Sequence, residues 1–245
     1  FQMEDDEADA EKAVNAYNTL KDNGMKVFIG TVTTGACLSV VSQTKADNMF
    51  QITPSASAAK VIANDNCFQV CFTDPNQGTA SADYIASKGL ATKVAVIYNS
   101  SDAYSSGIYD NFKAEAAAKG LDLVASEAFT GDSKQDFSSQ LSKIKASGAE
   151  LIFLPIYYQE ASLILSQAKN AGITAKFFGC DGLDGLLNIE NFDKSLAENV
   201  MLLTPFAANA TDETTKKFVA AYNAKYDPST LNQFAADAYD AVYIV

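Results

Sequence analysis

The sequence predicts an α/β fold in which parallel sheets are covered by helices on both faces, and three observations lead to this prediction. Short apolar runs alternate with amphipathic stretches along the 245 residues, and alternating strands and helices build parallel sheets. Residues 93–98 (KVAVIY) are almost wholly apolar, as in a parallel strand buried on both faces. Glycines repeatedly separate a helical stretch from the strand after it, as helix C-caps do.

Glycines and apolar runs divide the first half of the chain. The helical stretch 8–23 stops at Gly24, and the helical stretch 104–119 stops at Gly120. Between them we expect helices at 34–47 and 76–88, and strands at the apolar runs 26–30, 49–52, 68–72 and 93–98.

The second half of the chain follows the same rule. Helical stretches at 136–147 and 160–171 stop at Gly148 and Gly172. We also expect strands at 121–125, 150–155, 175–178 and 199–204, and helices at 211–226 and 233–245. No Gly-x-Gly-x-x-Gly or Walker A motif follows any strand, which disfavours a dinucleotide site and a P-loop.

The composition excludes several classes of protein. The net charge of −12 argues against binding to nucleic acid, which requires a basic surface, and against docking on anionic lipid. The chain contains neither His nor Arg, so a Ser-His-Asp triad, a Cys-His pair, a His metal site and a bidentate Arg clamp are impossible. No Cys-x-x-Cys pair is present, and we interpret the cysteines as buried thiols: Cys37, Cys67, Cys71 and Cys180.

Two hydroxyl-rich loops follow the first two strands. Because ligands bind beyond the carboxyl ends of parallel strands, these loops are the first to consider. In the loop 31–36, Thr33 or Thr34 caps a helix whose N–H groups are able to hold a carboxylate without Arg. In the loop 53–58, the backbone and Ser57 come close to a ligand. A plain helix cap and an ordinary turn remain the alternatives.

Three side chains follow later strands and supply a different chemistry. Tyr104 and Tyr157 offer aromatic walls, and Asp181 offers a carboxylate. Each has a simpler interpretation, as a core tyrosine or as a turn cap. Together with the two hydroxyl-rich loops, they suit a zwitterion: N–H and O–H groups hold its carboxylate, Asp181 holds its ammonium, and the rings face its aliphatic part.

The order of these loops resembles that of a known family. The resemblance is found in four segments: VFIGTVTTGACLSVVSQTKADNMFQITPSASA, FQVCFTDPNQGTASADYIASKGLATKVAVIYNSSDAYSSG, GDSKQDFSSQLSKIKASGAELIFLPIYYQEASLILSQAKNAGI and FFGCDGLDG. The chain resembles the leucine/isoleucine/valine-binding proteins, the type I periplasmic binding proteins of ABC importers. The resemblance implies two Rossmann-like lobes, one made of residues 1–73 and 205–245 and the other of residues 74–204. Against the family pattern, the first β-α unit and the C-terminal end are expected to be absent.

The resemblance also implies a role for individual residues. The ligand carboxylate is expected at Thr34 and at the second loop, and the ammonium at Asp181, where the best-known members carry the longer Glu. Ser105 stands where members often have Gly, and Thr33 stands at one position of a cysteine pair found in some members. The ligand-binding residues expected on this basis are Thr34, Ser55, Ala56, Ser57, Tyr104, Tyr157 and Asp181.

The function expected from the resemblance is capture of a small, branched-chain or other aliphatic amino acid between two lobes. The expected partner is the membrane permease of an ABC importer, and the chain is expected to be monomeric and not an enzyme, with neither cofactor nor metal. The expected location is extracytoplasmic, in the periplasm or at the outer cell surface, and a lipid anchor remains open. Three alternatives also remain: a ligand sensor with the same fold, a small α/β enzyme, and a binding protein for a non-amino-acid molecule.

Overall fold

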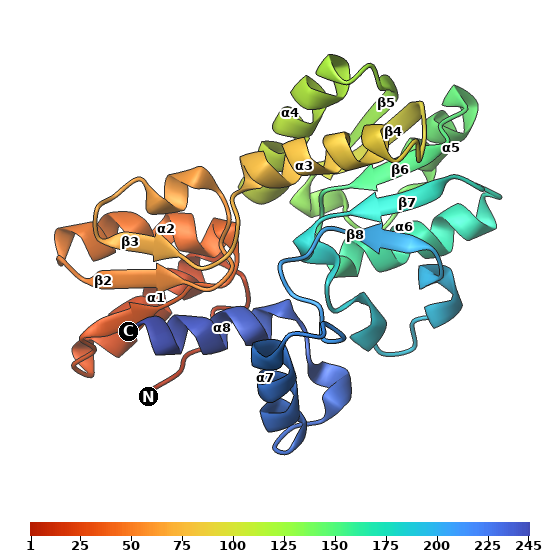
Figure 1. Cartoon of the computed structure of the whole chain (residues 1–245). Coiled ribbons are helices and arrows are strands. Elements are labelled where there is room, and N and C mark those ends of the chain that lie inside the picture. Colours follow the sequence, from red (N-terminus) through yellow and green to blue (C-terminus); the bar gives the residue numbers. More distant parts are fainter. The chain divides into compact units, whose positions relative to one another are not determined.

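The computed structural model describes residues 1–245 and divides into two compact units (Figure 1). Unit 1 consists of Phe1–Asp74 and Phe234–Val245, and unit 2 consists of Pro75–Gln233. Each unit has its own parallel sheet. The prediction of an α/β fold with parallel sheets is therefore confirmed.

Unit 1 is built on a three-stranded sheet with the order β1-β2-β3. The strands are β1 (Val27–Ile29), β2 (Phe50–Thr53) and β3 (Cys67–Gln69), all parallel. The helices of this unit are α1 (Ala10–Asp22), α2 (Thr34–Ala46) and most of α8 (Gln233–Ile244). Since β1 leads into α2 and β2 leads into the second hydroxyl-rich loop, both loops lie beyond the carboxyl end of this sheet.

The core of unit 1 joins its first two helices to its first strand. Tyr17 of α1 packs edge-on against Phe28 of β1, with 5.3 Å between ring centroids. The Tyr17 hydroxyl donates to Asp47 at the C-terminal end of α2, at 2.8 Å. Ala36 and Val40 of α2 complete this buried cluster and fix the helix against the sheet.

Unit 2 is built on a five-stranded parallel sheet with the order β5-β4-β6-β7-β8. Its strands are β4 (Lys93–Asn99), β5 (Asp122–Phe129), β6 (Leu151–Leu154), β7 (Lys176–Gly179) and β8 (Val200–Leu202). Its helices are α3 (Asp74–Ser87), which begins at the last residue of unit 1, α4 (Ala103–Ala118), α5 (Ser138–Ser147), α6 (Tyr158–Asn170) and α7 (Glu213–Asn223).

Strand β4 shows why this sheet is covered on both faces. Val94 and Val96 belong to one buried cluster with residues of α3 and α4. Ala95 and Ile97 belong to another, with residues of α5 and α6. Alternate residues of a strand point to opposite faces, so the apolar run predicted as a doubly covered strand is confirmed.

Every helix and strand expected from the sequence is present, and the bounds differ by a few residues. Strand β5 is longer than expected, and the helix expected at 211–226 is shorter, at Glu213–Asn223. Short 3₁₀ turns at Asp181–Leu183, Leu186–Asn188 and Lys194–Ala197 were not predicted. No helix has both the length and the apolar character needed to cross a lipid bilayer.

Residues 205–233 group with unit 2 in this structure, whereas the sequence places them in lobe one. Their end is fixed by Gln233, whose side-chain amide donates to the backbone oxygen of Asp181 at 2.8 Å. Thr204 also donates to the Gln233 side chain at 3.2 Å. The lobe boundaries themselves stay a prediction.

Candidate functional site

The first loop of unit 1 ends in a helix whose first turn is not capped by a side chain. Thr33 occupies the N-cap position of α2 with an extended backbone, but its hydroxyl makes no capping bond. That hydroxyl is buried and has no hydrogen-bond partner. The first N–H groups of a helix have no partner inside the helix and carry the positive end of its dipole. The first turn of α2 is thus equipped to hold an anion.

Thr34, the first residue of α2, binds the second loop. Its hydroxyl oxygen accepts the backbone N–H groups of Ser57 at 3.1 Å and Ala58 at 3.4 Å. A hydroxyl has two acceptor lone pairs and one hydrogen. Since both lone pairs are occupied, what Thr34 still offers is its hydrogen, as a donor.

The second loop carries a hydroxyl with no partner. Ser57 is 1% exposed, and its side-chain oxygen makes no hydrogen bond. Ser55 and Ala56, in the same loop, are also buried. A buried hydroxyl without a partner is costly, and this cost is relieved when a ligand atom bonds to it. We call the first turn of α2, the Thr34 hydroxyl and the Ser57 hydroxyl the donor half-site.

Unit 2 brings together the three later candidates. Tyr104 lies in the first turn of α4, and Tyr157 lies at the N-cap position of α6. Their rings stack with centroids 4.7 Å apart and an interplanar angle of 18°. The Tyr104 hydroxyl donates to the Asp181 carboxylate at 2.6 Å and accepts the Gly182 N–H at 2.9 Å. We call Tyr104, Tyr157 and Asp181 the acceptor half-site.

A glycine allows this close approach. A Cβ atom on Gly182 would lie 2.7 Å from the Tyr104 hydroxyl and 2.8 Å from the backbone oxygen of Ile156. Neither distance is tolerated by a real Cβ atom. Because residue 182 is a glycine, the Tyr104 hydroxyl can approach this turn and bond to the Asp181 carboxylate.

The backbone of Asp181 is held by two buried glutamines that the sequence did not single out. Its N–H donates to the side-chain oxygen of Gln77 at 3.2 Å, and its backbone oxygen accepts from Gln233 at 2.8 Å. Both glutamines are fully buried. They lie 104 and 52 residues from Asp181 in the chain, so no local motif reveals these contacts.

Burial shapes the electrostatics of the acceptor half-site. It raises the pKa of Asp181 from 3.8 to about 6, against hydrogen bonds from Tyr104 and Gln77 that lower it. A shift of this size costs the folded state about 3 kcal/mol when the group is ionised. Because the folded pKa is the higher one, protonation of Asp181 stabilises the folded state. This stabilisation is fully present below about pH 4 and is lost as the pH rises through 6. At pH 7 the site holds a buried negative charge that a cationic group would stabilise.

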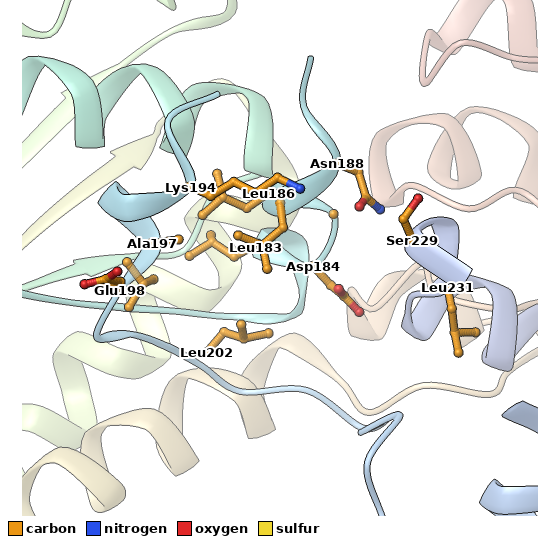
Figure 2. Close-up of a pocket in the computed structure, with 13 residues that line it drawn as sticks. Leu183, Asp184, Leu186, Asn188, Lys194, Ala197, Glu198, Leu202, Ser229 and Leu231 are labelled. Atoms are coloured by element: carbon orange, nitrogen blue, oxygen red, sulfur yellow. The ribbon is translucent and has the colours of Figure 1, made fainter. Parts of the chain in front are cut away.

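Three cavities, each formed within one unit, lie away from these residues. Figure 2 shows one of about 510 Å³ in unit 2, bordered by the turns that follow Asp181. Its walls are mainly apolar side chains such as Leu183, Leu186 and Leu202. None of the residues expected to bind ligand lines it.

Comparisons with known proteins bear on the family of the chain. The sequence pattern of the periplasmic binding protein family matches residues 1–245. The Leu/Ile/Val-binding protein homolog 3 of Brucella melitensis is 31% identical over 244 residues, which are 98% of this chain and 64% of that protein. The chain thus spans less than two thirds of the length of the curated relatives it matches first.

Two solved structures share the fold. The leucine-binding protein LivK from Thermotoga maritima superposes with a TM-score of 0.88 at 27% identity, over 98% of this chain and 68% of that one. The branched-chain amino acid transporter substrate-binding protein LivJ from Streptococcus pneumoniae, in complex with isoleucine, gives 0.85 at 26% identity, over 98% and 69%. The fold is therefore the expected type I periplasmic binding protein fold, and the chain belongs to the periplasmic binding protein family.

Proposed function

We propose that this chain captures a small aliphatic amino acid of the branched-chain type, outside the cytoplasm, for delivery to the membrane permease of an ABC importer. One observation carries the proposal: the two half-sites have opposite chemistry. The donor half-site offers hydrogen-bond donors and contains no charged acceptor; its donors are the hydroxyls of Thr34 and Ser57 and the first turn of α2. The acceptor half-site offers the buried carboxylate of Asp181.

An amino acid is a zwitterion and needs both kinds of group. Its carboxylate fits the donor half-site, because helix N-termini and hydroxyls bind anions without a cationic side chain. Its ammonium fits Asp181, whose buried charge lacks a cation in the described contacts. The stacked rings of Tyr104 and Tyr157 supply an apolar surface for the aliphatic part.

The relatives support this choice of ligand. The Brucella and Thermotoga proteins are named for Leu/Ile/Val binding and leucine binding, and the Streptococcus structure holds isoleucine. Membership in a family of binding proteins also supports a role in capture and not in catalysis. For this chain, the ligand class, the permease partner and the extracytoplasmic location are parts of our proposal.

Thermal shift against the twenty common amino acids tests the proposal. Ligand at about 100 times its dissociation constant adds about 2.7 kcal/mol to stability, so leucine, isoleucine or valine is expected to raise the melting temperature. Glutamate and lysine are the matched controls, because each adds a charge to the side chain and is expected to give no shift. A panel without any shift would contradict the proposal.

A further inference from the structure

We propose that Thr53, the last residue of β2, is a positioning residue that fixes the two loops of the donor half-site against each other and so sets the affinity for the ligand carboxylate. This inference rests on the proposed function. Thr53 does not belong to the residues expected to touch ligand. Its role follows from the bonds made by one buried hydroxyl.

The Thr53 hydroxyl joins both loops at once. It donates to the backbone oxygen of Thr31 in the first loop at 2.6 Å, and it accepts the backbone N–H of Ala56 in the second loop at 2.9 Å. Thr53 is 1% exposed, so water does not replace these bonds readily. One hydroxyl thus satisfies a buried backbone oxygen and a buried N–H that belong to different loops.

Backbone pairing stops before the loops begin. The last backbone bond between the first two strands joins the Gly30 N–H to the Ile52 oxygen at 2.9 Å. Beyond it, the hydrogen bonds between the two loops come from two side-chain hydroxyls, those of Thr53 and Thr34, while Cys37 of α2 packs in one apolar cluster with Ala56 and Ala58. The hydrogen bonds that hold the loops together therefore come from these two hydroxyls and not from the sheet.

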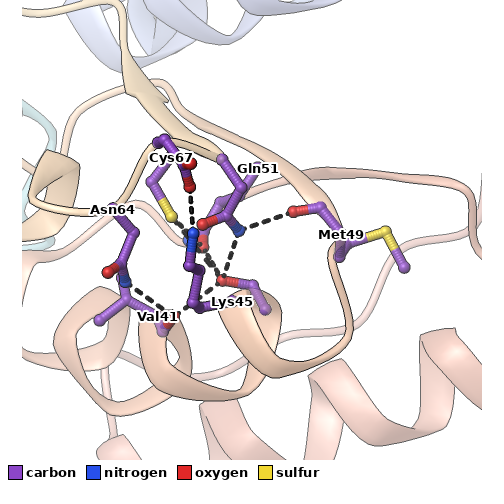
Figure 3. A network of polar contacts seen from close by, with 9 residues as sticks. Val41, Lys45, Met49, Gln51, Asn64 and Cys67 are labelled. Carbon is purple, nitrogen blue, oxygen red and sulfur yellow. Dashed lines mark hydrogen bonds and ion pairs between the residues drawn. The ribbon is translucent and has the colours of Figure 1, made fainter.

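The base of the first loop is fixed separately, by Gln51. Its side-chain amide donates to the Gly30 oxygen at 2.9 Å. Its side-chain oxygen accepts from Thr44 at 2.7 Å and from the Cys67 thiol at 3.2 Å. Figure 3 shows Gln51 within this polar network, which also includes Val41, Met49 and Asn64. Because this network fixes the end of the strand, the hydroxyl of Thr53 sets the distance between the two loops beyond it.

The bonds of the second loop explain why Thr53 matters for ligand. Thr53 and Thr34 together take up three consecutive N–H groups, those of Ala56, Ser57 and Ala58. With its backbone so held, the loop presents the Ser57 hydroxyl in one orientation. Loss of the Thr53 hydroxyl leaves Thr31 and Ala56 with unsatisfied buried groups and lets the loop move relative to the first turn of α2.

The test compares variants of residue 53 by calorimetric titration with leucine and with leucinamide, which lacks the carboxylate charge. Thr53→Val, nearly equal in shape, is expected to weaken leucine binding about tenfold and leucinamide binding less than threefold. Thr53→Ser, which keeps the hydroxyl, is expected to restore leucine binding to within threefold. Tyr17→Phe is the matched control, because it removes a partly buried hydroxyl bond at the opposite end of α2 and is expected to leave both affinities unchanged.

The outcomes separate this inference from the proposed function. If the unaltered chain does not bind leucine, the proposed function fails. If it binds leucine and Thr53→Val binds leucine as tightly, or loses leucine and leucinamide equally, the positioning role is overturned. Should the valine variant not fold, amide hydrogen exchange of Ala56 in the unaltered chain decides. Protection of this amide supports the positioning role of Thr53, and exchange as fast as in an open loop overturns it.

Discussion

Asp181→Asn is expected to weaken leucine binding at pH 7 by about 30-fold or more, as measured by calorimetric titration. Removing one partner of a buried charge pair costs roughly 2–5 kcal/mol, which is about 30-fold to several thousand-fold in affinity. The substitution keeps the shape of the side chain and an oxygen that accepts from Tyr104. It removes the charge that the ligand ammonium needs.

Two controls show whether lost binding reflects charge and not unfolding. Because ionised Asp181 destabilises the folded state at pH 7, the Asn variant is expected to melt no earlier than the unaltered chain. Asp184→Asn alters a neighbouring carboxyl whose pKa burial also raises, and it is expected to bind leucine within threefold of the unaltered chain. An Asp181→Asn variant with unchanged leucine affinity would refute the assignment of the ammonium to Asp181.

The pH profile of binding carries the same information. With a folded pKa of about 6, Asp181 is ionised at pH 7 and mostly protonated at pH 5. Leucine affinity is therefore expected to fall about tenfold between these values, and the Asn variant is expected to lack this dependence.

Gly78→Ala is expected to destabilise unit 2 by about 3 kcal/mol, as measured by calorimetric or chemical unfolding without ligand. A Cβ atom there would lie 2.5 Å from the backbone oxygen of Ile108 and 2.7 Å from the backbone nitrogen of Phe112. Both atoms belong to the backbone of α4, so a rotamer change does not relieve the clash. Helices α3 and α4 must move apart, and α3 carries Gln77.

Gly35→Ala is the matched control for the glycine in α3. It also lies inside a helix, but a Cβ atom there meets nothing within 4 Å. Alanine is better than glycine in a helix by roughly 0.5–1 kcal/mol, so this variant is expected to be as stable as the unaltered chain or more so. If Gly78→Ala and Gly35→Ala change the stability by the same amount, close packing of α3 on α4 does not explain why residue 78 is a glycine.

The sequence predicted the elements well because burial dictates their pattern. The run 93–98 is apolar on both sides because Val94 and Ala95 lie in different buried clusters. Helix ends were predictable where a glycine takes up a left-handed backbone, as Gly148 does with a φ of 71°. The 3₁₀ turns after β7 end at Asp184 and Ile189 and not at a left-handed glycine, and they were not predicted.

The site was predictable only to the level of loops. Position after a strand pointed to Tyr104 and Asp181, which the structure joins by a hydrogen bond. It did not show that the Thr34 oxygen is occupied by the second loop. It placed Thr53 in the second hydroxyl-rich loop without giving it a role, and it gave no sign of Gln77. The bonds of both residues depend on which backbone groups the tertiary fold leaves without partners.

The most direct test of the account is the affinity of the unaltered chain for leucine beside two blocked forms, leucinamide and N-acetylleucine. Opposite half-sites for the two ends of a zwitterion predict that each blocked form binds about 30-fold or more weaker than leucine, because each loses charge-assisted hydrogen bonds at one half-site. Equal binding of leucine and either blocked form would contradict the account, because the corresponding half-site would then hold no charged end of the ligand.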